Sequence, residues 1–78
     1  MAQLTALVTG SSRGIGAAIA ARLRARGLRV IGHARSAVDA DTIAADLADP
    51  TAAARIWETA LERCDGRIDV LVNNAGLF

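Results

Sequence analysis

The sequence contains no tyrosine, and all nine of its basic residues are arginine, so it contains no lysine either. Without these side chains the chain has no tyrosine general acid, no lysine for Schiff-base chemistry and no phosphate-loop lysine. Its one cysteine, Cys64, can form neither an internal disulfide nor, alone, a metal cluster. Much of the usual catalytic repertoire is therefore missing, and we identify no catalytic residue and no metal ligand in this chain.

An excess of charge of one sign and long apolar runs are also missing. Nine basic and eight acidic residues leave a formal net charge of +1, which is too small to indicate binding to nucleic acid or to an anionic membrane. No apolar run approaches a length of about 20 residues, which a helix needs to cross a bilayer. Residues 1–4 lack the basic start of a secretory signal. We therefore expect a cytoplasmic protein without a nucleic-acid or membrane partner.

The chain is rich in apolar residues, and these alternate between two kinds of pattern. Of its 78 residues, 53% are hydrophobic, which excludes a disordered tail and suits one small domain at most. Short apolar runs predict strands at residues 4–8, 28–34, 41–45 and 68–72, and helical spacing predicts helices at 15–26 and 49–65. Strands that alternate with helices through short loops indicate an α/β fold with a parallel sheet.

Each expected helix has an apolar stripe that would face the sheet. The stripes consist of Ile15, Ile19 and Leu23 in the first helix and of Ile56, Ala60 and Cys64 in the second. Cys64 is therefore expected to be a small core residue and not a nucleophile, and Trp57 is expected to pack beside this stripe. Asp49 is the predicted N-cap of the second helix, with Pro50 at its first position.

The most informative motif is Thr-Gly-Ser-Ser-Arg-Gly-Ile-Gly at residues 9–16, between the first strand and the first helix. Gly10 allows the chain to reverse sharply after the strand. Gly14 lacks the Cβ that would hold a pyrophosphate away from the backbone, and Gly16 allows the helix to pack closely on the sheet. The helix N-terminus then offers N–H groups to the phosphates. A plain glycine-rich turn is the alternative, and the flanking strand and helix favour a dinucleotide site.

Three features together resemble the short-chain dehydrogenase/reductase family. They are the Gly-x-x-x-Gly-x-Gly spacing, the Asp46-Leu47 pair ahead of Asp49-Pro50, and Asn-Asn-Ala-Gly at residues 73–76. The form of the glycine motif is closest to members of the 3-oxoacyl-acyl-carrier-protein reductase type. The resemblance implies a Rossmann-type doubly wound parallel sheet, incomplete here, with about four strands and two main helices. It makes residues 1–78 the N-terminal part of a dinucleotide-binding domain, truncated after Asn-Asn-Ala-Gly.

The resemblance also implies which residues bind the cofactor. The glycine motif would surround the phosphates, Asp46 would accept a hydrogen bond from the adenine amino group, and Asn74 would line the adenosine ribose. Asn73 would tie the fourth strand to a neighbour through its amide. The expected set is Gly10, Ser11, Ser12, Arg13, Gly14, Ile15, Gly16, Arg35, Asp46, Leu47, Asn74, Ala75 and Gly76. For Asp46 the alternative is a solvated loop carboxylate, and for Asn73-Asn74 it is a turn-forming pair.

The residues at the end of the second strand favour NADP(H) over NAD(H). An NAD site places an acidic side chain about 20 residues beyond the glycines, where it holds the ribose 2′-hydroxyl. Here that place is occupied by His33-Ala34-Arg35, without a carboxylate. Arg35 and Arg13 can flank a 2′-phosphate, each with a forked donor; a solvated cation is the alternative for Arg35. His33 is interpreted as a strand residue near the cofactor, without a catalytic role.

The resemblance implies a catalytic tyrosine, a lysine four residues after it, a serine and an asparagine, all beyond Asn-Asn-Ala-Gly. The sequence ends two residues after that motif, so whether this chain alone is an enzyme stays open. It is the cofactor-binding part of a carbonyl-reducing oxidoreductase, a non-catalytic dinucleotide-binding module, or an inactive remnant. One piece of an enzyme assembled from separate chains is a further alternative. Because one side of the fourth strand would lack a partner, we expect aggregation unless a homo-oligomer or the remainder of the fold covers it.

Overall fold

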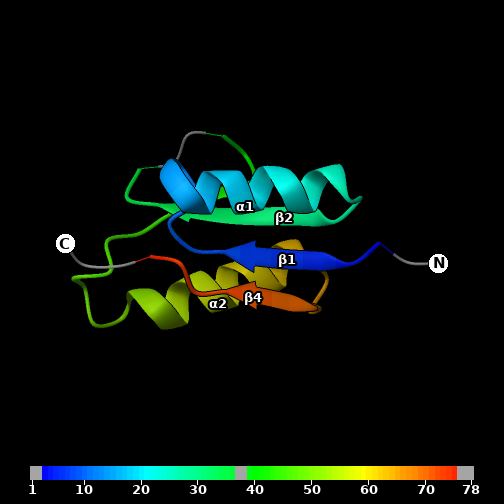
Figure 1. Cartoon of the computed structure of the whole chain (residues 1–78). Helices are drawn as coiled ribbons and strands as arrows, with labels where there is room; N and C mark the ends of the chain where they lie inside the picture. Colours follow the sequence, from blue (N-terminus) through cyan, green and yellow to red (C-terminus); the bar gives the residue numbers. More distant parts are fainter. Residues whose placement is uncertain (1–2, 37–38, 76–78) are drawn as a thin grey trace.

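The computed structural model describes residues 3–36 and 39–75 (Figure 1). Six elements follow one another in the predicted order of strands and helices. They are β1 (Thr5–Val8), α1 (Gly14–Ala25), β2 (Arg29–Ala34), β3 (Thr42–Ala44), α2 (Ala52–Arg63) and β4 (Val70–Val72). Within these described ranges, no helix has the length and apolar character that a membrane span requires.

The strands of the described chain form one four-stranded parallel sheet in the order β3-β2-β1-β4. β1 lies inside this sheet, with Leu7 in register with Ile31 of β2 on one side and Leu71 of β4 on the other. All four residues of β1 are buried. The chain thus moves outward from β1 to β3 and then returns to the opposite side of β1. This is the Rossmann-type arrangement, and the predicted fold class is confirmed.

Each face of the sheet has its own apolar core, because alternate residues of a strand point to opposite faces. On one face, Leu7 and Ile31 pack with Ile56 of α2. On the other face, Val8 packs with Ala20 of α1. The two helices therefore cover opposite faces of the sheet, as Figure 1 shows.

The buried face of α1 differs from the predicted one. Gly16 and Ala20 are its buried residues, Ile19 and Leu23 pack at the border of the core, and Ile15 is 73% exposed. The expectation that Ile15 starts the core stripe is wrong. The helix lies so close to the chain beneath it that only small residues fit at the centre of the contact. Its larger apolar side chains are displaced to the borders.

The apolar stripe of α2 is confirmed, since Ile56, Ala60 and Cys64 are all buried. Trp57, one position aside from this stripe, is 40% exposed, so it is not the packed residue that we expected. Successive residues of a helix point about 100° apart. The ring of Trp57 therefore leaves the core face even though its neighbour Ile56 is buried there.

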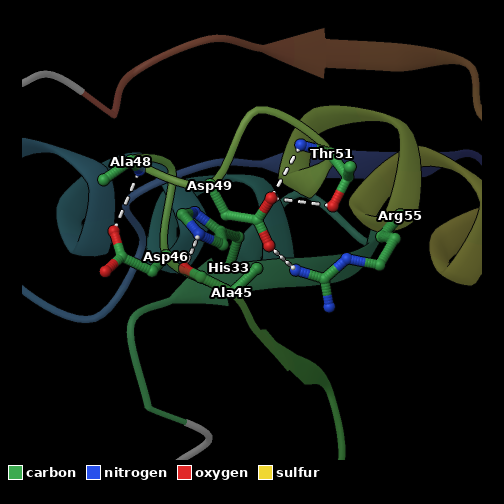
Figure 2. Close-up of polar contacts among 7 residues, drawn as sticks. All are labelled: His33, Ala45, Asp46, Ala48, Asp49, Thr51 and Arg55. Atoms are coloured by element: carbon green, nitrogen blue, oxygen red, sulfur yellow. Dashed lines mark hydrogen bonds and ion pairs between the residues drawn. The ribbon is translucent and has the colours of Figure 1, made fainter.

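The capping contact predicted for Asp49 is present, although the assigned helix begins at Ala52, two residues after Pro50. The Asp49 carboxylate accepts hydrogen bonds from the Thr51 N–H and hydroxyl, both at 2.8 Å, and from Arg55 at 3.0 Å (Figure 2). Thr51 itself has helical dihedral angles and makes no side-chain cap hydrogen bond, so Asp49 supplies the cap at this end of α2. The Thr51 N–H first, then its hydroxyl and the Arg55 guanidinium, lower the pKa of Asp49.

Asp69 fixes the start of β4 to the start of β1. The Thr5 N–H donates to Asp69 Oδ2 at 2.8 Å, and the Asp69 N–H donates to the Thr5 carbonyl at 2.9 Å. Arg67 Nε donates to Asp69 Oδ1 at 2.7 Å. The Thr5 N–H, and after it the Arg67 guanidinium, lower the pKa of Asp69 below its ordinary value of 3.8. The ionised carboxylate is therefore the form that stabilises the fold.

We expect Asp69→Asn to remove part of the pH dependence of stability. Because the pKa is lowered in the folded state, Asp69 stabilises the fold fully above the unfolded value, and this contribution is lost as the pH falls through the lower folded value. Urea unfolding from about pH 7 to about pH 2 measures it. The free energy of unfolding should fall less steeply in Asp69→Asn than in the parent. Asp65→Asn, at an exposed carboxylate, is the control; equal slopes for all three proteins would contradict the assignment.

Candidate functional site

A cleft of about 600 Å³ lies at the carboxyl ends of the four strands. It is next to the point between β1 and β4 where the strand order reverses, which is where open α/β sheets bind their ligands. Its lining comes from the segments after each strand: Gly10, Ser12, Arg13 and Gly14 after β1; His33, Ala34, Arg35 and Ser36 at the end of β2; Ala45, Asp46 and Leu47 after β3; and Asn74 and Ala75 after β4.

Most of the predicted cofactor-binding residues therefore meet in one cleft, although they come from four separate segments. Ser11, Ile15 and Gly16 belong to the predicted set but do not line it, and Gly76 lies outside the described residues. His33, which was expected near the cofactor but not in the binding set, also lines the cleft, and Ala34, Ser36 and Ala45 line it without having been predicted. Their contribution depends on how the ends of β2 and β3 come together, which no motif in the sequence specifies.

The glycine loop after β1 has the backbone geometry that its glycines were expected to provide. Gly10 and Gly14 have φ angles of +64° and +62°, in the left-handed region that side chains disfavour. A Cβ on Gly10 would also lie 3.0 Å from Ala75 Cα, whereas one on Gly14 would meet no atom within 4 Å. Gly14 thus presents bare backbone to the open cleft.

Ser11 points away from the cleft and toward β2. Its N–H donates to the His33 carbonyl at 2.9 Å, and its Oγ accepts a hydrogen bond from the His33 N–H at 3.1 Å. This contact requires glycine at position 32, because a Cβ there would collide with Ser11 Oγ. Sequence reasoning missed Gly32, although a glycine inside a strand is itself a sign of close backbone approach.

The close approach predicted for Gly16 is present, but its partner is the glycine loop and not a strand of the sheet. A Cβ on Gly16 would collide with the Gly10 carbonyl oxygen and lie 2.5 Å from Asn74 Nδ2. That amide donates to the same Gly10 carbonyl at 3.2 Å. The segment after β4 is therefore tied to the loop through Asn74. Asn74 thus makes a link of the kind expected for Asn73, and the tie from Asn73 to a neighbouring strand stays a prediction.

Thr9 supports the same junction and was also missed. Its hydroxyl oxygen accepts hydrogen bonds from the N–H groups of Asn74 and Ala75, both at 3.1 Å, and donates to the Val72 carbonyl at 3.4 Å. A threonine at the end of a buried strand gives no sign in the sequence that a segment more than 60 residues away will need its hydroxyl. The walls formed by β1 and β4 are held together at this point.

Three charged side chains line the cleft. Arg13 is the N-cap residue of α1, Arg35 follows β2, and both are exposed. Asp46 follows β3, and its Oδ1 accepts a hydrogen bond from the Ala48 N–H at 2.9 Å (Figure 2). The cleft thus has two guanidinium groups near the loop and β2, and one carboxylate on the β3 side. Among the residues described at the end of β2, none is acidic.

The residues and the fold both match known proteins. The family model for short chain dehydrogenases matches residues 4–78. The chain belongs to this family. It is 46% identical over 82 residues to the 3-oxoacyl-[acyl-carrier-protein] reductase FabG of Haemophilus influenzae, covering 92% of this chain and 34% of that protein. The corresponding FabG of Escherichia coli is 42% identical over 83 residues, with 92% and 34% covered.

Solved structures share the fold of this chain. A blue fluorescent protein from a metagenomic library, in complex with NADPH, has a TM-score of 0.83 and 39% identity, with 96% of this chain and 37% of that chain covered. The 3-alpha-hydroxysteroid dehydrogenase of Pseudomonas sp. B-0831, complexed with NADH, has a TM-score of 0.81 and 41% identity, with 94% and 31% covered. The chain spans about a third of the length of the relatives it matches.

We expect Gly16→Ala to destabilise the protein, although alanine is the better helix former. The helix propensity gained is about 1 kcal/mol, and the collision with the Gly10 carbonyl costs more, for a net loss of about 1–2 kcal/mol. Ala18→Ser adds one heavy atom to the exposed face of the same helix and should change stability by less than about 0.5 kcal/mol. Urea unfolding compares the two; a Gly16→Ala protein as stable as the parent would contradict the close approach.

Proposed function

We propose that this chain binds NADP(H) in the cleft and is the cofactor-binding part of a short-chain oxidoreductase that transfers hydride between a carbonyl and an alcohol. The observation that carries the proposal is the position of the glycine loop and the α1 N-terminus beside Arg13 and Arg35 in one cleft. The nicotinamide of a bound cofactor supplies the hydride chemistry, and the residues of this chain bind and orient the rest of the molecule.

The phosphate side of the proposal rests on the loop and the helix. Gly14 exposes its backbone to the cleft, and α1 begins there with no acidic residue in its first turn. The N–H groups at the start of a helix lack partners within the helix and have a partial positive charge, which favours phosphate oxygens. This geometry suits the pyrophosphate that all nicotinamide dinucleotides share, and it does not discriminate between NAD(H) and NADP(H).

The preference for NADP(H) rests on charge at the end of β2. Arg35 and Arg13 line the same cleft, and the two described residues directly after β2, Arg35 and Ser36, are not acidic. A 2′-phosphate is matched by guanidinium groups, whereas a ribose 2′-hydroxyl is matched by an acidic side chain. The related structures contain NADPH in one case and NADH in another, so the preference is argued from these residues. Asp46, across the cleft, is proposed to face the adenine.

A binding module without catalysis is the second candidate function, because the chain contains neither tyrosine nor lysine. In the oxidoreductase, the proton donor and the substrate pocket would come from sequence beyond this chain, as the length of the relatives suggests. An intact mass of the protein made by its native host separates the candidates. A mass near three times that of this chain supports the oxidoreductase, and NADPH binding without turnover at the mass of this chain supports the module.

We expect Arg35→Asp to weaken NADPH binding by about ten- to a hundredfold, since one charge-assisted phosphate contact is worth roughly 1.5–3 kcal/mol. NADH binding should be retained or improved, because the new carboxylate can accept a hydrogen bond from the 2′-hydroxyl. Fluorescence titration measures both affinities. Arg22→Asp makes the same charge change on the exposed surface of α1, outside the cleft, and should leave the ratio unchanged. Equal affinities of the parent for NADPH and NADH would contradict the preference.

We expect Gly14→Val to abolish dinucleotide binding while the protein stays folded. Its Cβ would meet no protein atom within 4 Å, so the added bulk enters only the cleft. Gly66→Val is a matched control, because Gly66 also has a positive φ and open space around its Cβ, but lies outside the cleft. Both variants should have the same strain, and only Gly14→Val should lose NADPH binding in the titration. If both bind equally well, the pyrophosphate does not lie against Gly14.

A further inference from the structure

The imidazole of His33 connects two walls of the cleft that come from different strands. The side chain is buried, with 3% of the residue exposed. Its Nδ1 accepts a hydrogen bond from the Gly10 N–H at 3.1 Å, and its Nε2 lies 2.9 Å from the Ala45 carbonyl oxygen. Figure 2 shows the second contact, next to Asp46. Gly10 begins the phosphate loop, and Ala45 immediately precedes Asp46, so one ring spans the phosphate and adenine sides.

The two partners define which form of the ring fits between them. A backbone N–H can only donate and a carbonyl oxygen can only accept, so Nδ1 must offer its lone pair and Nε2 must hold the proton. The neutral Nε2–H tautomer alone satisfies both contacts. Protonation of Nδ1 would place two donors face to face at the 3.1 Å separation between Nδ1 and the Gly10 nitrogen.

The backbone of His33 holds the same loop. Its carbonyl accepts a hydrogen bond from the Ser11 N–H, and its N–H donates to Ser11 Oγ. If the hydrogen bond between the Gly10 N–H and the His33 ring is lost, the loop has little room to rearrange. Gly10 lies against Ala75, and its carbonyl accepts a hydrogen bond from the Asn74 amide. The ring of His33 therefore sets the position of the Gly10 end of the loop relative to Ala45 and Asp46, which form the adenine wall of the cleft.

We propose that His33 is a positioning residue for dinucleotide binding, and that its neutral form is the one that holds the phosphate loop against the adenine wall. The proposal rests on the proposed function of the cleft. The charged groups that share the cleft with His33 are Arg13, Arg35 and Asp46; β1 and β3 contribute no titratable residue. Dinucleotide affinity should therefore fall as the ring becomes protonated.

Two amide variants separate the two contacts of the ring, and neither changes charge with pH. His33→Asn places an acceptor near the position of Nδ1 and keeps the hydrogen bond from the Gly10 N–H, but it loses the hydrogen bond to the Ala45 carbonyl. His33→Gln places a donor near the position of Nε2 and leaves the buried Gly10 N–H without its acceptor. Binding of NADP⁺ is measured from about pH 8 to about pH 5.5 in the protein as its native host makes it. Circular dichroism verifies the fold of each variant.

We expect the parent to lose more affinity than His33→Asn does when its ring is protonated, because only the parent then has two donors facing each other at Gly10. At about pH 8 His33→Gln should bind about tenfold more weakly than His33→Asn, because an unpaired buried N–H is costly. The 2′-phosphate of NADP⁺ itself titrates near pH 6, so parent and variant are compared with the same ligand, and NAD⁺ serves as a second probe without that phosphate. A buried histidine that is only structural would not leave His33→Asn with the flatter pH profile.

The outcomes are distinguishable. A parent that binds neither NADP⁺ nor NAD⁺ at about pH 8 contradicts the proposed function. A parent that binds, with the same pH profile as His33→Asn, overturns the role of His33 alone. If the variants fail to fold, the nitrogen chemical shifts of the His33 ring in the parent decide: an Nε2–H tautomer supports the proposal, and an Nδ1–H tautomer or a charged ring at about pH 8 overturns it.

Discussion

The architecture depends on the contact between the start of α1 and the loop from which that helix departs. The space between Gly16 and the Gly10 carbonyl oxygen cannot hold a single carbon atom, so helix and loop form one rigid unit. Because of this contact, the N-terminus of α1 points toward the cleft, and the small residue Ala20, one turn later, packs against the sheet. The Asn74 amide donates to the same carbonyl, and this hydrogen bond attaches the helix and the loop to the segment that follows β4.

The features that depend on residues close together in the sequence were predicted correctly. The element order, the parallel sheet and the burial of Cys64 follow from apolar periodicity, and the glycine motif located the loop. Predictions that required knowledge of packing failed, as for the exposed Ile15, whose neighbour Gly16 takes the central position. The capping contact of Asp49 was predicted correctly, because it joins residues only two positions apart in the chain.

The parts of the site that could not be predicted are contacts between distant segments. Thr9 and His33 give no sign in the sequence of the distant groups that they contact, and a glycine inside a strand, such as Gly32, does not identify the segment that approaches it. The sheet face beside α2 is different: Leu71 of β4 is 50% exposed there and, together with Trp57 of α2, borders a hollow of about 260 Å³. That surface is apolar, and whether a further part of the fold or a second copy covers it is a prediction that stays untested.

The pairing of β1 with β4 has a consequence for the order of events during biosynthesis. The Thr9 hydroxyl oxygen accepts a hydrogen bond from the Asn74 N–H, and the two residues are 65 positions apart in the chain. A ribosome adds about 5–20 residues per second, so the glycine loop emerges several seconds before the segment that completes its cleft. Until β4 emerges, β2 is the only one of its two neighbours in the sheet with which β1 can pair, and the other edge of β1 is exposed to any strand nearby. A chaperone that shields this edge would therefore act on a nascent chain that cannot yet hold a nucleotide.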